Sequence, residues 1–327
     1  MSTGKVAIVF GGAGFIGTHL IETLRKSSQY GRIIAADIRP RKDGTRDGIE
    51  HLYCDVRCPI RIGGSVENAE IYNLAAVHTT PGHADWEYYW TNVRGAVEIN
   101  KFARDIGSNT LVFTSSISTY GPTEEPRDES GPLLPESAYG RSKLLAEETH
   151  RMWQAAAPGR RLVVVRPAVI FGPGEHGNFT RLASALKRRV FAYPGRRDTI
   201  KSCCYVGELV RSMLFVRDLG APEVTYNCAY PERYTSEDIC NAFHDVAGYA
   251  RPSFTVPIGG MLAAGRIFEG LASLGVRTSV NRARVLKLVM STNIIPKRLP
   301  ELGYSFETTL KSGLERWKAA SENGEFV

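Results

Sequence analysis

Tyr139 and Lys143 are the residues whose types and spacing most directly suggest chemistry. They stand four apart at the start of an apolar-periodic run that predicts a helix to residue 157, so both side chains project from one helix face. An ammonium near a phenol stabilises the phenolate and lowers the tyrosine pKa. Such a tyrosine can interconvert an alcohol and a ketone. Because this spacing is common by chance, the prediction also needs a hydride carrier and a partner for the substrate oxygen.

The N-terminal segment predicts a site for that carrier. Residues 6–10 predict a buried strand, residues 18–26 predict a helix, and Gly11, Gly14 and Gly17 lie between them. Strand, glycine turn and helix in this order form the phosphate-binding start of a dinucleotide fold. The glycines allow a tight turn close to the pyrophosphate, and the helix N-terminus offers free N–H groups to the anion. A glycine-rich turn without a ligand is the weaker alternative in this context.

The nature of the cofactor is indicated by the second predicted strand, residues 32–38. This strand carries Asp37 near its end. A carboxylate there accepts hydrogen bonds from the adenosine ribose and repels a 2′-phosphate, which favours NAD over NADP. Arg39, Arg41 and Lys42 follow and reduce that repulsion, so NADP stays open as the less favoured cofactor.

Further strands are expected at residues 49–56, 69–76, 109–116 and 161–165, with helices between them. This alternation predicts a Rossmann-like, doubly wound α/β fold with a parallel sheet. Ligands in such sheets lie at the carboxyl ends of the strands. The fifth strand ends in Ser115 and Ser116, whose hydroxyls could bind a substrate oxygen or cap the next turn. The capping alternative is stronger for Ser115 than for Ser116.

The pattern changes beyond residue 172, where short helices are joined by links rich in proline and glycine. Helices are expected at residues 178–190, 206–219, 235–248, 258–274, 281–290 and 309–320, and short strands at 224–229 and 253–256. We therefore expect two domains. Residues 1–172 would form the NAD-binding domain with the catalytic residues. Residues 173–327 would form a smaller, mostly helical substrate lobe, with segments that can return to the sheet.

Composition narrows the class of protein. The net charge of +7 comes from 41 basic and 34 acidic residues, and we identify no nucleic-acid-binding surface. No signal-peptide pattern is present and no apolar run reaches transmembrane length, so we expect a cytoplasmic protein without a membrane partner. The six cysteines lack Cys-x-x-Cys spacing, which predicts free thiols and no metal site.

Together the motifs resemble extended short-chain dehydrogenases/reductases and, more narrowly, the nucleotide-sugar epimerase/dehydratase family. The motifs, in family order, are Gly11-x-x-Gly14-x-x-Gly17, Asp37, Asp55-Val56, Asn73-x-Ala75-Ala76, Ser115-Ser116 and Tyr139-x-x-x-Lys143. In the second half, family segments are matched by Phe171-Gly172-Pro173-Gly174 and Arg197-Asp198-Thr199-Ile200. The resemblance covers nearly the whole chain.

The resemblance implies roles for matching residues. Tyr139 would be the acid/base, Lys143 would lower its pKa and hold the nicotinamide ribose, and Ser116 would bind the reacting oxygen. The residues that would contact or support the dinucleotide are Gly11, Gly14, Phe15, Ile16, Asp37, Asp55, Val56, Leu74, Ala75, Ala76, Asn92, Tyr139 and Lys143. The residues that would bind substrate are His78, Ser116, Asn178, Phe191 (or Tyr193), Arg197 and Arg284 (or Arg282). As a lone histidine, His78 is more often structural, and the late arginines could equally belong to a solvated helix face.

Two departures from the family pattern bear on the reaction. Ser116 is followed by Ile117, Ser118 and Thr119, where the family's dehydratases and decarboxylases carry acidic residues. Val169 stands where relatives usually have an asparagine near the substrate diphosphate. The first departure favours hydride transfer without elimination, and the second weakens the expected substrate contacts.

We therefore expect an NAD-dependent nucleotide-sugar epimerase that acts at C4 through a transient 4-keto intermediate. The alternatives are a nucleotide-4-keto-sugar reductase that consumes NAD(P)H, a hydroxysteroid or alcohol dehydrogenase, and a non-catalytic NAD-sensing protein. The substrate would be a nucleoside-diphosphate sugar. The resemblance also implies a homodimer formed by the helices expected at 85–106 and 139–157, whose outer faces would carry Tyr88, Trp90, Met152 and Trp153.

Overall fold

The computed structural model describes residues 4–39, 45–46, 48–79, 82–260, 289–321 and 323–326. Its centre is an eight-stranded sheet with strand order β12-β8-β6-β5-β1-β2-β4-β3. The strands are β1 (Lys5–Phe10), β2 (Tyr30–Asp37), β3 (Thr45–Arg46), β4 (Ile49–Tyr53), β5 (Glu70–Asn73), β6 (Thr110–Thr114), β8 (Arg161–Pro167) and β12 (Glu223–Cys228). Neighbours pair in parallel, except that β3 is antiparallel to β4. The predicted α/β, doubly wound class is confirmed.

Strand β1 shows why the sheet strands are continuously apolar. Ala7 and Val9 contribute to one buried core cluster, and Ile8 and Phe10 contribute to the other. Successive side chains of a strand point to opposite faces, so a strand between two layers of helices must be apolar at every position. The sequence of β1 therefore requires helices on both faces of the sheet.

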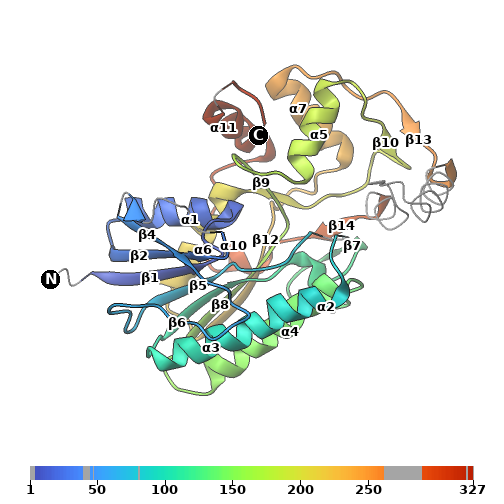
Figure 1. The fold of residues 1–327 in the computed structure, drawn as a ribbon. Helices are drawn as coiled ribbons and strands as arrows, with labels where there is room; N and C mark the ends of the chain where they lie inside the picture. Colours follow the sequence, from blue (N-terminus) through green and yellow to red (C-terminus); the bar gives the residue numbers. More distant parts are fainter. Residues whose placement is uncertain are drawn as a thin grey trace, which may run out of the picture.

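The helices supply those two layers (Figure 1). On one face α1 (Phe15–Lys26) and α6 (Val206–Asp218) contribute to the first cluster. On the other face α3 (Arg94–Asp105) and α4 (Ala138–Ala155) contribute to the second. The single helix expected at residues 85–106 is interrupted. It is formed by α2 (Asp85–Tyr88), a π-helical turn (Tyr89–Val93) and α3, and such turns are often found at functional sites.

The second half of the chain builds a lobe beside the sheet (Figure 1). Its helices are α5 (Asn178–Lys187), α7 (Ser236–Ala247), α10 (Arg298–Glu301) and α11 (Leu310–Ala320). Three pairs of short strands are also present: β7 (Thr123–Arg127) with β14 (Thr292–Ile294), β9 (Val169–Phe171) with β11 (Cys203–Tyr205), and β10 (Tyr193–Pro194) with β13 (Thr255–Val256). Of these six strands, the sequence predicted only β13, within residues 253–256. No helix among the described residues is long and apolar enough to cross a bilayer.

The two halves share one core, because part of the second half returns to the sheet. Strand β12 pairs with β8 from Glu223 opposite Leu162 to Cys228 opposite Pro167. Helix α6, from the same half, covers the sheet face next to α1. The helices expected at 258–274 and 281–290 lie mostly outside the described residues, and so do both late arginines considered above, Arg282 and Arg284.

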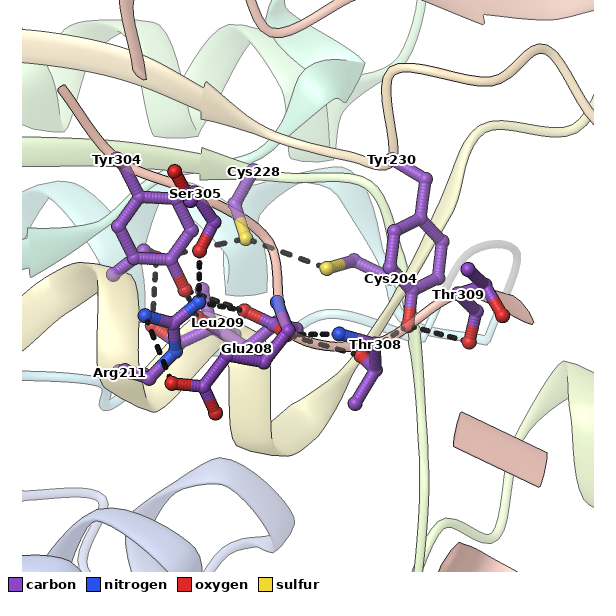
Figure 2. Close-up of polar contacts among 12 residues, drawn as sticks. Cys204, Glu208, Leu209, Arg211, Cys228, Tyr230, Tyr304, Ser305, Thr308 and Thr309 are labelled. Atoms are coloured by element: carbon purple, nitrogen blue, oxygen red, sulfur yellow. Dashed lines mark hydrogen bonds and ion pairs between the residues drawn. The ribbon is translucent and has the colours of Figure 1, made fainter. Parts of the chain in front are cut away.

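A buried carboxylate at the start of α6 connects the C-terminal segment to this helix (Figure 2). Glu208 is 2% exposed, and its Oε1 accepts hydrogen bonds from the backbone N–H groups of Glu307 and Thr308, each at 2.7 Å. Its Oε2 accepts from the Tyr304 hydroxyl at 2.5 Å and from Arg211 at 2.9 Å. Burial alone would raise the pKa of Glu208, but these donors outweigh burial and hold the pKa below its usual value.

The six cysteines are free thiols, as predicted. Cys204 and Cys228 are buried with their Sγ atoms 3.8 Å apart (Figure 2). Burial raises the pKa of Cys240 to about 11 and therefore keeps it a neutral thiol at ordinary pH. In the described part of the chain, no three His, Cys, Asp or Glu side chains are grouped to hold a metal ion.

Candidate active site

The end of β6 and the first turn of α4 bring Ser116 and Tyr139 together. Ser116 follows β6 by two residues, and its side chain lies close enough to the phenol of Tyr139 to act as a hydrogen-bond donor that lowers the pKa of that phenol. The Ser116 Oγ also accepts a hydrogen bond from the backbone N–H of Ser118 at 3.1 Å. This second bond caps the short 3-10 helix Ile117–Thr119 and fixes the serine rotamer.

A glycine allows α4 to begin this close to the strand end. The Ser137 Oγ caps α4 by accepting a hydrogen bond from the Gly140 N–H at 3.1 Å. A Cβ placed on Gly140 would lie 2.3 Å from the carbonyl oxygen of Ser118 and 3.0 Å from the Cβ of Pro135. Any other residue would push the helix away from the turn after Ser116. Gly140 was not singled out from the sequence, although it stands inside the Tyr-x-x-x-Lys spacing.

Ser115 has a different environment from Ser116. Its Oγ donates a 2.5 Å hydrogen bond to Oε1 of Glu147, a fully buried residue of α4. The same carboxylate accepts two hydrogen bonds from Arg166 of β8, at 2.9 and 2.7 Å. Ser115 therefore belongs to a buried polar group that fastens α4 to the sheet, and Ser116 is the serine that faces Tyr139.

Lys143 lies one helical turn after Tyr139 and is 1% exposed. Its Nζ is 4.5 Å from the centre of the Phe113 ring. Burial lowers the pKa of Lys143 to about 7, although the charge of Glu147 opposes that shift. At the phenol, burial raises the pKa of Tyr139, and the hydrogen bond from Ser116 only partly offsets it. The expected lowering of the tyrosine pKa by Lys143 is not found in this arrangement, because burial dominates at both groups.

A neutral histidine, His150, lies two turns after Lys143 on α4 and links this helix to neighbouring elements. His150 is fully buried, with Nδ1 2.7 Å from Oδ1 of Asn100 and Nε2 3.0 Å from Nδ2 of Asn73. Burial, with a further contribution from the Lys143 charge, lowers the pKa of His150 to about 3. Neither His150 nor Glu147 was expected from the sequence. The missed signal is their spacing of seven and four residues from Lys143, which places all three on one helix face.

The glycine turn has the shape that a dinucleotide pyrophosphate requires. A Cβ on Gly17 would lie 2.4 Å from the carbonyl oxygen of Gly11, and one on Gly11 would lie 2.8 Å from the backbone N of Ala75. Gly11 also has a φ of +78°, which L side chains rarely adopt. Gly14 caps α1, whose first turn, beginning at Phe15 and Ile16, contains no acidic residue to compete with an anion. These features fit a bound NAD.

Asp37 lies beside the glycine turn, as expected for a residue that binds the adenosine ribose. Its Oδ2 accepts a hydrogen bond from the Ala13 N–H at 3.1 Å, and its Oδ1 accepts from the Arg39 N–H at 2.9 Å. Asp55 is paired with Arg57 at 2.7 Å, and the hydrogen bonds from that guanidinium lower the pKa of Asp55.

The loop after β5 completes this end of the sheet. Leu74, Ala75 and Ala76 are half-buried, and Gly11 packs directly against the first two. Val56, 5% exposed, packs under α3, where a Cβ on Gly95 would lie 2.9 Å from its Cγ2.

Asn92 and His78 border that loop in different ways. The Asn92 Oδ1 accepts a hydrogen bond from the Val77 N–H at 3.0 Å. Its Nδ2 donates to the Val77 carbonyl at 3.2 Å and to the Ser142 hydroxyl at 2.9 Å. These contacts use both amide hydrogens and one lone pair of the amide oxygen, so Asn92 holds the loop that contains Val77 in place. Burial and the nearby charge of Lys143 lower the pKa of His78, which places this imidazole at the border of the candidate site.

The expected substrate residues of the lobe contact other parts of the lobe. The Asn178 side chain accepts a hydrogen bond from Arg181 at 2.9 Å. Arg197 donates to Glu237 at 3.2 Å and to the carbonyl of Ser253 at 2.7 Å.

Two aromatic residues were considered for stacking on a nucleotide base. Tyr193 is 1% exposed and lies under the Arg197 guanidinium, 5.2 Å from ring centre to Cζ, so it is not available for stacking. Phe191 is half-buried and packs edge-on against Tyr193 at 5.6 Å. Of the two, only Phe191 remains a candidate.

The fold and site define a dinucleotide-binding α/β enzyme with a serine, a tyrosine and a lysine at the carboxyl edge of its sheet. The chain belongs to the NAD dependent epimerase/dehydratase family, whose model matches residues 7–229. The match confirms the family predicted from the sequence and NAD as its cofactor.

The similarity to known proteins extends over nearly the whole chain. The N-acetyl-alpha-D-glucosaminyl-diphospho-ditrans,octacis-undecaprenol 4-epimerase of Escherichia coli O157:H7 is 27% identical over 94% of this chain and 93% of its own. A 4-hydroxy-2-methyl-3-oxo-4-farnesyl-3,4-dihydroquinoline-1-oxide ketoreductase of Stigmatella aurantiaca is 22% identical over 97% of both chains. The solved UDP-glucose 4-epimerase of Thermotoga maritima has a TM-score of 0.74 at 19% identity, covering 95% of this chain and 97% of its own.

Proposed function

We propose that this protein is an NAD-dependent 4-epimerase of a sugar linked through a diphosphate, with a nucleoside diphosphate as the expected carrier. The observation that carries the proposal is the contact between Ser116 and Tyr139, one turn from Lys143 and at the same sheet edge as the glycine turn. The E. coli relative acts at C4 of a sugar carried on a lipid diphosphate. A prenyl diphosphate is therefore the alternative carrier.

In the proposed mechanism Tyr139 handles the proton of the C4 hydroxyl. When bound, NAD supplies a hydride acceptor that later returns the hydride. Tyr139 Oη, as the phenolate, takes the hydroxyl proton while Ser116 Oγ donates a hydrogen bond to the same oxygen. Because burial raises the pKa of Tyr139, this step requires the positive charge of Lys143 close by. After the 4-keto sugar rotates, Tyr139 returns the proton on the opposite face.

The turn after Ser116 supports hydride chemistry without loss of water. Ile117 and Thr119 are buried and Ser118 lies between them, so the 3-10 helix offers no carboxylate to the substrate. An elimination needs an additional acid and base near the leaving group. We therefore propose epimerisation and not dehydration.

The test is to incubate the purified protein with UDP-hexoses, and separately with a prenyl-diphospho-N-acetylhexosamine in detergent, without added reductant. A 4-epimer of one of them is expected, and Tyr139→Phe should abolish its formation. Tyr89→Phe is the matched control, because the Tyr89 hydroxyl accepts a hydrogen bond from the exposed Arg141 at 3.3 Å. An epimerase activity unchanged in Tyr139→Phe would refute the mechanism.

A reductase is the second candidate, and the farnesyl-quinoline ketoreductase from Stigmatella aurantiaca supports it through its similarity over 97% of both chains. A reductase and an epimerase can share the same serine, tyrosine and lysine. Cofactor stoichiometry separates them: a reductase oxidises one NAD(P)H per product, and an epimerase consumes none. Product formation that stops when NADH is exhausted would assign the protein to the reductases.

We also propose a cytoplasmic homodimer that pairs through α3 and α4, with a correction to the expected surface. Trp90 and Met152 are 50% and 74% exposed, but Tyr88 and Trp153 are buried within the protomer. Only the first two can therefore contribute to an interface. Light scattering at micromolar concentration should give the mass of a dimer, and Trp90→Ser with Met152→Ser should shift it toward the monomer.

A further inference from the structure

The edge of the lobe formed by β10 and β13 exposes large apolar side chains. Val190, just before β10, is 69% exposed, and Phe254, just before β13, is 75% exposed. Val256, Ile258 and Met290 are exposed as well. We refer to these five residues, with Arg188 and Arg189, as the β10/β13 edge. An exposed apolar patch of this kind usually marks an interaction site.

Backbone contacts hold these segments together although they are far apart in the chain. The N–H of Tyr193 donates to the carbonyl of Phe254 and that of Gly195 to the carbonyl of Val256, both at 2.9 Å. A Cβ on Gly195 would lie 2.6 Å from a side-chain carbon of Ile258. Figure 1 shows β10 and β13 at the end of the molecule opposite the N-terminus, on the side to which the carboxyl ends of the sheet strands point.

Basic residues predominate in the segments that carry the apolar side chains. Residues 187–197 contain five basic residues and no acidic residue, and residues 251–260 contain one basic and no acidic residue. Four of these six basic residues have acidic partners: Lys187 pairs with Glu325, Arg196 with Glu124 and Asp198, Arg197 with Glu237, and Arg251 with Asp245. Among the described residues, no carboxylate pairs with Arg188 or Arg189, which directly precede Val190. Two exposed cations therefore border the most exposed apolar side chains.

We propose that the β10/β13 edge docks on the surface of an anionic lipid bilayer. Phe254 and Val190 enter the boundary between headgroups and acyl chains, and Arg188 and Arg189 lie at the level of the lipid phosphates. A bilayer surface presents negative charge and apolar material in successive layers, which matches this order of side chains. The proposal needs no spanning helix, revises the expectation that no membrane partner exists, and does not depend on the proposed epimerase activity.

The experiment is cosedimentation of the full-length protein with vesicles of phosphatidylcholine alone, or of phosphatidylcholine with phosphatidylglycerol. We expect binding to the anionic vesicles that weakens as salt is raised. Val190→Ser with Phe254→Ser should weaken it about tenfold or more, because both apolar anchors are removed. Arg188→Gln with Arg189→Gln should remove about tenfold or more of the preference for anionic vesicles, at roughly fivefold per basic side chain.

The matched control is Tyr53→Ser with Leu219→Ser, which removes two exposed apolar side chains at the end of β4 and just after α6 and should bind like the wild type. Wild-type protein that stays in the supernatant with anionic vesicles would overturn the proposal. So would edge variants that bind as well as the control. Self-association that the Val190 and Phe254 substitutions break, without vesicle binding, would assign the edge to a second copy and refute lipid docking. Turnover of a water-soluble substrate is measured in parallel, so failure of the docking and failure of the proposed function are separate results.

Discussion

The hydroxyl of Ser115 donates a 2.5 Å hydrogen bond to the buried carboxylate of Glu147. Consecutive residues of an extended strand end point in opposite directions, so the next serine, Ser116, points toward Tyr139 instead. Two neighbouring hydroxyls thus have separate roles, one in attaching α4 to the sheet and one in the candidate chemistry.

The two serines should respond differently to replacement by alanine. Ser116→Ala should lower kcat by about 10²–10³, the typical effect of losing one donor to a developing oxyanion, with little change in Tm. Ser115→Ala should instead cost about 1–3 kcal/mol of stability, because a buried carboxylate loses a hydrogen bond. Steady-state kinetics and thermal unfolding of both variants test this. The assignment is wrong if Ser115→Ala reduces kcat as strongly as Ser116→Ala in fully folded protein.

Gly140→Ala should damage both packing and activity. The added Cβ would meet the Ser118 carbonyl oxygen at 2.3 Å, so α4 must shift away from the turn after Ser116. We expect a loss of about 1–3 kcal/mol in stability and a drop in kcat, because Tyr139 moves with the helix. Gly63→Ala is the control, since a Cβ there meets nothing within 4 Å. Equal Tm and kcat for both variants would contradict the argument.

Asp37→Ala should change the cofactor preference. The carboxylate is oriented by the Ala13 and Arg39 N–H groups, and hydrogen bonds from ribose hydroxyls to a charged group contribute about 1.5–3 kcal/mol. NAD affinity should therefore fall about 10- to 100-fold, while NADP binding stays equal or improves. Calorimetric titration with both dinucleotides measures this, with Asp105→Asn at the exposed end of α3 as control. An unchanged ratio of the two affinities would exclude the role of Asp37.

His150 should make the protein less stable as the pH falls. Its pKa is about 3 in the folded protein against 6.5 for an ordinary histidine, so between these values only the unfolded chain binds the proton. Stability is therefore constant above pH 6.5 with respect to this group and falls toward pH 3, by up to about 1.4 kcal/mol per pH unit. We expect the free energy of unfolding, measured with urea between pH 7 and 5, to depend less on pH in His150→Gln than in the wild type. Parallel curves would mean that His150 is protonated in the fold.

Glu208→Gln should weaken the attachment of the C-terminal segment to α6. The amide cannot accept from the Glu307 and Thr308 N–H groups, Tyr304 and Arg211 as a charged carboxylate does, so we expect a loss of about 1–3 kcal/mol. Glu315→Gln, on an exposed position of α11, should stay within about 0.5 kcal/mol of the wild type. Chemical denaturation measures both. Activity per folded molecule should be unchanged, since none of these partners of Glu208 belongs to the candidate active site.

Local sequence determined the parts of this protein whose meaning is contained in a few consecutive residues. The strand, glycine turn and helix around Gly11–Gly17 follow from apolar periodicity and from backbone space that only glycine provides. The one-turn spacing of Tyr139 and Lys143 follows from helix geometry alone. Asp37 is likewise recognisable because it ends the next strand, after the helix that follows that turn.

Only the tertiary structure decided which side chains meet across the chain. The sequence favoured Ser116 over Ser115 for the chemistry, but the actual role of Ser115 follows from Glu147 and Arg166, which come from other elements to form a buried polar group with it. Strand β12 joins the sheet beside β8 after a long excursion through the lobe. Such contacts depend on how distant segments pack, which no local periodicity encodes. The same reason explains the β10/β13 edge, where side chains from three separate segments form one surface.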